Sequence, residues 1–327
     1  MKPFKFMRAA KADDAVAAAL SLPTGSFIAG GTTLVDLMKE KVMSPELLVD
    51  INALPFAKIE ESGKSVRIGA MARNSDLAEH PLIRERYPML SEALLSGASQ
   101  QIRNTATVGG NLLQRTRCYY FRDPAAPCNK RQSGSGCGAM EGFNRIHAVL
   151  GGSSSCIATH PSDMCVAMAA LDATIHIQGK NSERSVPITD FYKLPGDSPD
   201  RETVLDPGDL IVAVELPEIP YAKKSRYLKV RDRASYEFAL SSAAVALDVK
   251  DNHIQAARIA LGGVATIPWR AREAEKALLS ATPDLESFQK AAEAEMKSAT
   301  PHQFNAFKID LAKRTLVRAL TETWRQA

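Results

Sequence analysis

The sequence of 327 residues predicts an α+β protein built in three units. Residues 1–55 alternate strand, helix, strand, helix and strand patterns, as a small α/β unit does. Residues 56–220 mix strand and helix patterns around a long stretch without periodicity. Residues 221–327 begin with two alternating strands joined at Asp251-Asn252 and continue as helices, which indicates an antiparallel sheet with helices.

The composition is that of an ordinary folded protein and excludes several classes of function. Hydrophobic residues make up 45% of the chain, and 327 residues are enough for two or three domains with real hydrophobic cores. The net charge of +4 comes without any Lys/Arg run, so nucleic acid is not an expected partner. No run of about 18 apolar residues is present, so no membrane span is expected. Because Asp13 and Asp14 interrupt the N-terminal alanines, that segment predicts a strand and a helix and not a secretory signal.

The first unit carries a glycine pair between a strand and a helix. Residues 26–40 predict a short apolar strand, a turn at Gly30-Gly31 and an amphipathic helix, and residues 47–51 predict a buried strand. Glycines in such a turn let the backbone approach a ligand, and the N-terminus of the following helix attracts an anion.

A second glycine pair repeats this chemistry. Gly109-Gly110 lies between Thr107 and Asn111, which add a hydroxyl and an amide. Two such loops could bracket both phosphates of a diphosphate. Neither loop matches GxGxxG or GxxxxGK[ST], so a Rossmann or P-loop site lacks support. For each pair taken alone, a tight turn is the alternative.

The second unit contains one segment that secondary structure does not explain. Strand and helix patterns are predicted at 65–71, 81–99 and 161–177. Between them, residues 114–156 are rich in Gly, Ser, Cys, Arg and Pro and have no periodicity. A structureless loop of this length is unusual in a compact unit unless another group organises it.

Four of the five cysteines fall in or at the edge of that segment, in the pattern C-x9-C-x8-C-x18-C. The spacing contains no CxxC knuckle, so an iron–sulfur cluster is favoured over zinc. Two disulfides are the alternative in an oxidising compartment. The expected ligands are Cys118, Cys128, Cys137 and Cys156. The neighbouring residues that could pack closely on a cluster or offset its negative charge are Gly134, Gly136, Gly138, Arg115, Arg117, Lys130 and Arg131.

Three further residues near this segment have simpler interpretations. Cys165 lies in an apolar helical run and is expected to pack in the core. His147 and His160 are alternative metal ligands, but single histidines are more often ordinary hydrogen-bonding residues. His160 is also expected near a flavin because of its neighbours.

Five motifs are distributed along the chain: AGGTTLVD (29–36), TVGGN (107–111), ATHPSDM (158–164), VELP (214–217) and KVRDRASYEFALSSAAVAL (229–247). Together they resemble the motifs of the FAD-binding subunits of the xanthine oxidase family of molybdenum hydroxylases. The resemblance covers the whole chain and implies a vanillyl-alcohol-oxidase-type (PCMH-type) FAD-binding fold. The cysteine-bearing insertion is similar to that of the medium subunit of bacterial periplasmic aldehyde oxidoreductases, where it carries a [4Fe–4S] cluster.

The resemblance also implies which residues hold FAD. Those expected to wrap its diphosphate are Phe27, Ile28, Ala29, Gly30, Gly31, Thr32, Thr33, Leu34 and Val35, helped by Thr107, Gly110 and Asn111. Asp163 is expected at the ADP ribose or adenine, with a helix N-cap as the alternative. Ile211 is expected to touch the adenine or the flavin through its backbone. Lys229 is expected near the isoalloxazine ring, with a solvated strand lysine as the alternative.

The function that follows is electron transfer within a heterotrimer, with no catalytic residue in this chain. A large partner subunit with a molybdenum cofactor would oxidise aldehyde to carboxylic acid. A small partner with [2Fe–2S] clusters would pass the electrons to FAD, and FAD would pass them to an external acceptor. Because residues 231–238 carry no dinucleotide fingerprint, an acceptor other than NAD is expected.

Two other functions stay open, and so does the location. A stand-alone flavin oxidase would need acid–base residues next to the flavin, and the six histidines form no such group in the sequence. A zinc-stabilised binding module would use the cysteines alone, with the glycine pairs as turns. The resemblance implies export to the periplasm together with a signal-bearing partner, and the cytoplasm is the alternative.

Overall fold

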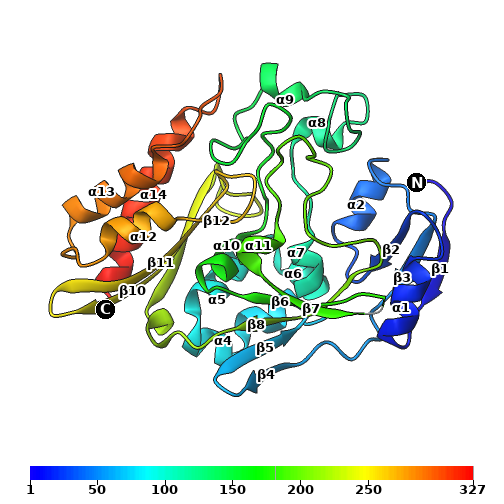
Figure 1. The fold of residues 1–327 in the computed structure, drawn as a ribbon, viewed down its shortest axis with the longest axis horizontal. Helices are drawn as coiled ribbons and strands as arrows, with labels where there is room; N and C mark the ends of the chain where they lie inside the picture. The colour runs from blue at the N-terminus through cyan, green and yellow to red at the C-terminus, as the bar shows by residue number, and fades with distance from the viewer. Residues whose placement is uncertain (181, 327) are drawn as a thin grey trace.

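The structure is a computed structural model that describes residues 1–180 and 182–326. Three sheets follow one another across the molecule, a three-stranded sheet near the N-terminus, a five-stranded sheet in the middle and a four-stranded sheet on the opposite side (Figure 1). Helices pack on each of them, so the predicted α+β class is confirmed.

The first sheet is parallel and small. Its order is β1-β3-β2, with strands β1 (Lys5–Arg8), β2 (Gly25–Ile28) and β3 (Leu47–Asp50). Helices α1 (Ala12–Ala19) and α2 (Leu34–Lys39) connect the strands, as the alternating pattern predicts. Val49 on the central strand is fully buried and packs with Val16 of α1, because an amphipathic helix must cover one face of so small a sheet.

The middle sheet is antiparallel throughout, in the order β4-β5-β8-β6-β7. Its strands are β4 (Ile59–Ser62), β5 (Ser65–Gly69), β6 (Thr174–Gln178), β7 (Glu183–Pro187) and β8 (Leu210–Leu216). The helices of this part of the chain are α3 (Asn74–Glu79), α4 (Pro81–Arg86), α5 (Pro88–Ser96), α6 (Gln100–Thr105), α7 (Val108–Leu112), α10 (Asp163–Ala170) and α11 (Ile188–Phe191).

Helix α10 is the centre of the molecule. All its residues from Met164 to Ala170 are buried, because it contacts α5 on one side and strands of the C-terminal sheet on the other. A helix that is apolar all round fits only such a position. Its first residue, Asp163, therefore lies where the middle of the chain meets the C-terminal sheet.

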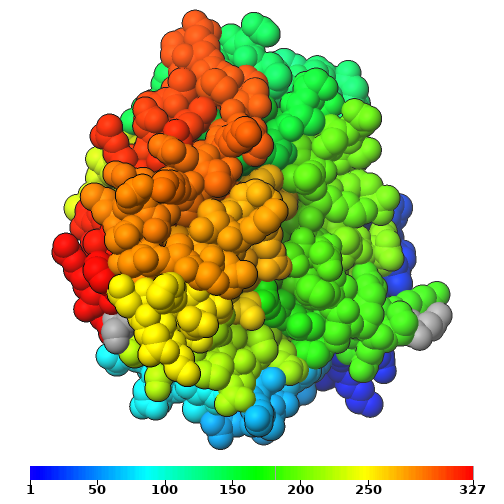
Figure 2. Space-filling model, turned by 60° about the vertical axis from the view of Figure 1, so that its left-hand side comes forward, coloured from blue at the N-terminus to red at the C-terminus, as the bar shows by residue number. Residues whose placement is uncertain are grey.

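The C-terminal unit is an antiparallel sheet covered by three helices. The sheet has the order β12-β11-β10-β9, with strands β9 (Ser225–Val230), β10 (Ser241–Lys250), β11 (His253–Gly262) and β12 (Trp269–Arg270). A short 3-10 helix, η1 (Pro220–Lys223), leads into it, and helices α12 (Arg272–Leu278), α13 (Leu285–Met296) and α14 (Phe307–Trp324) cover it. Figure 2 shows this unit packed directly against the middle of the chain.

The predicted hairpin turn is present in this sheet. Asp251 and Asn252 have φ angles of 51° and 58°, the left-handed conformation that a two-residue turn between twisted strands requires. The unit boundaries at residues 55 and 220 stay predictions.

The segment 114–156 has little secondary structure of its own. It contains only the short helices α8 (Tyr119–Arg122) and α9 (Gly138–Glu141) and lies above the middle sheet, near α2 (Figure 1). Arg122 contacts Asp36 of α2 and Glu40, the residue that follows α2, at 2.8 and 2.7 Å. None of the helices in the described ranges is long and apolar enough to cross a membrane.

Candidate functional site

The two glycine pairs lie side by side, and this arrangement is possible because Gly30 of the first pair has no side chain. A Cβ atom on Gly30 would lie 2.0 Å from the carbonyl oxygen of Thr105, just before the second glycine loop. The sequence assigns the glycines to close approach of a ligand. At Gly30 the close approach is to the neighbouring backbone, and its effect is to bring the two loops together.

Two residues that the sequence patterns do not mark hold this arrangement. Asn52 donates from its amide to the carbonyl oxygen of Ala29 at 3.0 Å. Arg73 donates to the carbonyl oxygen of Thr105 and to the side-chain oxygen of Asn52. Both glycine loops are therefore tied to the same pair of polar side chains. Only their positions at the end of a strand and the start of a helix could have drawn attention to them.

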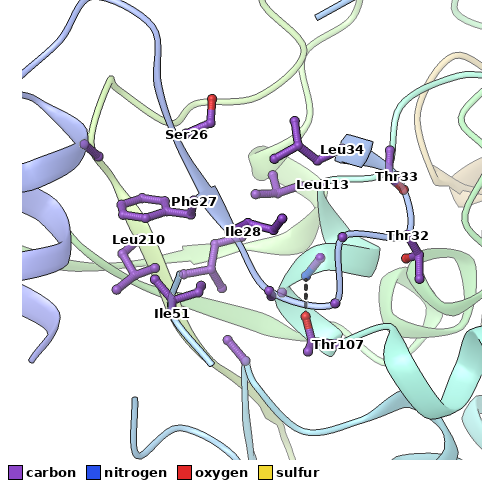
Figure 3. A pocket seen from close by; sticks show the side chains of 18 of the residues that line it. Ser26, Phe27, Ile28, Thr32, Thr33, Leu34, Ile51, Thr107, Leu113 and Leu210 are labelled. Carbon is purple, nitrogen blue, oxygen red and sulfur yellow. Dashed lines mark hydrogen bonds between the residues drawn. The ribbon is translucent and has the colours of Figure 1, made fainter. Parts of the chain in front are cut away.

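A cavity of ≈ 300 Å³ opens along the first glycine loop. Figure 3 shows apolar side chains, among them Phe27, Ile51 and Leu210, at one end and the threonines at the other. The expected FAD-binding residues that line this cavity are Phe27, Ile28, Ala29, Gly30, Gly31, Thr32, Thr33, Leu34, Thr107, Gly110 and Ile211. The volume and the mixed lining suit a cofactor with an apolar ring and a polar linker.

A second cavity, of ≈ 260 Å³, continues on the far side of the glycine loops. Thr32, Thr33 and Gly110 line both cavities, so the two adjoin at the glycine pairs. Asn111 and Lys229 line only the second. The remaining expected residues are Asp163, which lines the second cavity, and Val35, which lines neither and packs near Gly31.

Asp163 and Lys229 form a buried ion pair at the wall of the second cavity. Their Oδ2 and Nζ atoms are 2.7 Å apart, and their side chains are 9% and 3% exposed. Tyr227 donates to the other carboxylate oxygen at 2.6 Å, and burial followed by the charge of Asp163 raises the pKa of this tyrosine well above its ordinary value.

The contacts of Asp163 and Lys229 bear on three sequence-based interpretations. Lys229 is not a solvated strand lysine, because its ammonium is buried. The N-cap of α10 is Ser162, whose hydroxyl accepts from the Cys165 amide at 3.1 Å, and not Asp163. Asp163 and Lys229 are also in contact, so they cannot lie at opposite ends of an extended dinucleotide.

Some polar groups of the second glycine loop form hydrogen bonds within the protein. Thr107 is buried and its hydroxyl oxygen accepts from the Gly110 amide at 3.2 Å, the bond drawn in Figure 3. The side-chain oxygen of Asn111 accepts from Ser162 at 2.7 Å and from Gln114. These bonds fix the loop, and the Thr107 hydroxyl hydrogen and the Asn111 amide hydrogens are the groups left to donate.

The four clustered cysteines line one small cavity in the segment 114–156. All five cysteines lie within the described ranges and are free there, so no disulfide joins them. Cys128 and Cys137 face each other through an isolated antiparallel bridge, and Cys118 is the N-cap of α8. Cys165 lies apart in the core, 3.1 Å from the hydroxyl of Tyr192, which agrees with the expected packing role.

Burial favours the neutral thiol at two of these cysteines. Burial raises the pKa of Cys118 to about 12. Burial also raises the pKa of Cys156, although the nearby charge of Lys130 opposes the rise. Across residues 1–180 and 182–326, no three His, Cys, Asp or Glu side chains converge on a point where one metal ion could bind.

The cationic side chains that are expected to offset the charge of a cluster pair with carboxylates or backbone carbonyl oxygens in the structure. Lys130 lines the cysteine cavity and lies 3.4 Å from Glu202, and Arg115 binds the same carboxylate at 2.6 Å. Arg117 pairs with Asp36 at 2.9 Å. Arg131 donates to backbone carbonyl oxygens within its own loop, so its role is to fold the segment.

The two histidines near the segment differ in their contacts. The Nε2 atom of His147 lies 3.1 Å from the sulfur of Cys118, and burial lowers the pKa of this histidine to about 4. His160 accepts from the Ser162 amide at 3.3 Å, and burial lowers its pKa to about 3. It lines a third, smaller cavity, which Asp163 also lines. Asp163 lines the second cavity too, so the two cavities are neighbours.

Comparison with known families agrees with this geometry. The family described as "FAD binding domain in molybdopterin dehydrogenase" matches residues 2–219. The family described as "CO dehydrogenase flavoprotein C-terminal domain" matches residues 226–323. Together they span both cavities and the C-terminal sheet.

Individual relatives agree as well. The chain is 50% identical over 329 residues to the aldehyde oxidoreductase FAD-binding subunit PaoB of Escherichia coli K12, covering 100% of each chain. It is 30% identical over 250 residues to the glyceraldehyde dehydrogenase medium chain of Sulfolobus acidocaldarius, covering 76% of this chain and 71% of the relative. A solved carbon monoxide dehydrogenase chain from Hydrogenophaga pseudoflava has a TM-score of 0.78 and 27% identity, covering 100% of each chain.

These matches confirm the expected FAD-binding fold, and relatives such as the carbon monoxide dehydrogenase medium chain of Hydrogenophaga pseudoflava are named as chains of larger enzymes. The chain belongs to the FAD-binding subunits of the molybdenum hydroxylase family and is part of an FAD-dependent oxidoreductase.

Proposed function

We propose that this chain is the electron-transfer subunit of a molybdenum-dependent aldehyde oxidoreductase, and that it carries both FAD and a [4Fe–4S] cluster. It takes electrons from [2Fe–2S] clusters of a small partner, after a large partner oxidises aldehyde to carboxylic acid, and delivers them to an external acceptor other than NAD. The observation that carries the proposal is the 50% identity over the full length of an aldehyde oxidoreductase FAD-binding subunit.

The residues of the two cavities fit FAD. A dinucleotide needs an extended site with polar groups at its middle, and the two cavities adjoin at Thr32, Thr33 and Gly110. The hydroxyls of Thr32 and Thr33 and the backbone of both glycine loops would hold the diphosphate there. When bound, FAD can collect electrons one at a time and release two together.

Lys229 is the residue of this chain best placed to act on the cofactor electronically. Its ammonium lines the second cavity and is held by Asp163 and by the carbonyl oxygen of Ser96 at 3.1 Å. A buried cation at fixed position stabilises negative charge that develops beside it. We place the isoalloxazine ring in the second cavity for this reason, and the adenosine in the first.

Four cysteines lining one cavity supply the ligand set of a [4Fe–4S] cluster. A [4Fe–4S] cluster takes one cysteine on each iron, so the sulfurs stand around a cavity as Cys118, Cys128, Cys137 and Cys156 do. Iron binding would deprotonate the thiols, and the backbone amide of Ala158, 3.5 Å from the sulfur of Cys156, would donate to the thiolate.

The partners and the location follow from the same resemblance. Relatives are named as medium chains or subunits of dehydrogenase complexes. We propose a heterotrimer with one molybdenum-cofactor subunit and one [2Fe–2S] subunit, exported to the periplasm behind a signal carried by a partner.

Anaerobic reduction of the purified complex tests the proposal. Aldehyde added without an acceptor is expected to bleach the flavin absorbance of the complex, and the isolated chain mixed with aldehyde is expected to show no change. Bleaching by the isolated chain would instead favour a stand-alone flavin oxidase. A complex that binds FAD but is never reduced by aldehyde would contradict the proposed substrate.

A further inference from the structure

One side chain touches a cluster cysteine from outside the cysteine cavity. The Nε2 atom of His147 lies 3.1 Å from the sulfur of Cys118, and the residue is 1% exposed. His147 is absent from the lining of the cavity that the four cysteines surround. Its contact with the cysteine site is therefore through the Cys118 sulfur.

The C-terminal unit holds this histidine in place. Lys308 of α14 is fully buried, and its ammonium donates to the carbonyl oxygens of Ile146, His147 and Gly263 at 3.0, 2.9 and 2.5 Å. The amide of Asn305 donates to the carbonyl oxygens of His147 and Ala148. The backbone around His147 is thus anchored by α14 and by Asn305, two residues before that helix.

The hydrogen-bonding partners decide which ring nitrogen carries the hydrogen. A cysteine bound to iron is a thiolate and has no hydrogen to donate, so the contact with Cys118 requires hydrogen on Nε2 of His147. The other nitrogen, Nδ1, is buried, and although the backbone of Asn144 lies near the ring, Nδ1 makes no hydrogen bond of ordinary geometry. As a bare acceptor it is tolerated more easily than an orphaned N–H would be.

We propose that His147 is a positioning residue for the iron–sulfur centre, donating an Nε2–H hydrogen bond to the Cys118 thiolate and raising the reduction potential of the cluster. The proposal rests on the proposed function, because it requires the cluster. In the step concerned, the cluster gains one electron from the reductant and no proton moves. Negative charge on the sulfurs increases, so a fixed N–H donor stabilises the reduced form more than the oxidised form.

A redox titration of three variants in the assembled complex tests this. His147→Leu removes the donor, and His147→Gln keeps an N–H at similar reach. His176→Leu is the matched control, because His176 is half-buried in β6 and bonds to Ser185 and Glu215, away from the cysteines. Iron content is measured for each variant, and the reduced cluster is counted by electron paramagnetic resonance against solution potential with dithionite as reductant.

We expect the ratio of reduced to oxidised cluster at a fixed potential to fall about five- to tenfold in His147→Leu, with His147→Gln and His176→Leu close to wild type. Loss of iron in His147→Leu with full iron in His147→Gln would also support a donor role. Unchanged potential in an iron-replete His147→Leu, or equal loss of iron in both His147 variants, would overturn it. A wild-type complex without this cluster would reject the proposed cofactor itself, and the inference with it.

Discussion

The Nζ atom of Lys229 lies 2.7 Å from the Oδ2 atom of Asp163, and this contact joins two units of the fold. Lys229 belongs to β9 of the C-terminal sheet, and Asp163 is the first residue of α10. Both side chains are almost completely buried at the wall of the second cavity. The C-terminal sheet therefore completes a cavity whose other walls come from the middle unit.

Removing one partner of this ion pair is expected to lower the free energy of unfolding more than replacing both partners. Lys229→Met leaves a buried carboxylate without its cation, so the free energy of unfolding of the FAD-free chain should fall by about 3–5 kcal/mol. Urea unfolding checks this. The double variant Lys229→Met/Asp163→Asn should recover part of the loss, and a single variant as stable as wild type would show that the ion pair is not formed.

Gly30 is expected to tolerate no side chain. Gly30→Ala would place a Cβ atom 2.0 Å from the Thr105 carbonyl oxygen and push the glycine loops apart. We expect a loss of about 1–3 kcal/mol in stability and a protein purified with little FAD. Flavin absorbance per chain measures the second effect. In Gly63→Asn, at a turn with open space around the Cα atom, flavin content should stay normal.

Much of the local structure can be predicted from the sequence. The alternating first unit, the glycine-pair turns and the Asp251-Asn252 hairpin all depend on residues close together in the chain, whose propensities act locally. The cysteine cavity can also be anticipated, because four thiols in one aperiodic segment have few other uses.

The contacts between distant segments could not be predicted in this way. Nothing near Gly30 in the sequence indicates that Thr105 will press against it, and nothing near Asp163 indicates Lys229. Asn52 and Arg73 were missed for the same reason, since their role exists only after both glycine loops have met.

The contact of Glu202 with Lys130 and Arg115 should make stability depend on pH. Burial alone would raise the pKa of Glu202, but the two cations lower it below its ordinary 4.5. A depressed folded pKa contributes stability above the unfolded pKa, and that stability is lost as pH falls through the folded pKa. Glu202→Gln should therefore lose about 1–3 kcal/mol at pH 7 and approach wild type below pH 4.5.

Thermal and urea unfolding over a pH series check this expectation. Glu286→Gln, which removes an exposed pair with Lys290, serves as the control and should change stability little at any pH. A constant difference between Glu202→Gln and wild type across the series would contradict the assigned ion pairs.

Cys128 should be needed to fold the segment 114–156. Cys128→Ser removes one proposed iron ligand, so we expect loss of iron and rapid proteolysis within this segment, because metal binding supplies folding free energy directly. Limited proteolysis with iron analysis checks it. Cys165→Ala, a change in the core away from the cavity, should keep full iron, and equal iron in both variants would exclude Cys128 as a ligand.

Cofactor stoichiometry tests most directly whether this one chain holds both FAD and the cluster. The chain is purified anaerobically within its complex, separated from its partners under native conditions, and analysed for flavin, iron and zinc. We expect one FAD and four irons per chain, with the broad visible absorbance of an iron–sulfur cluster. A folded chain with FAD but without iron, or with one zinc in its place, would contradict it.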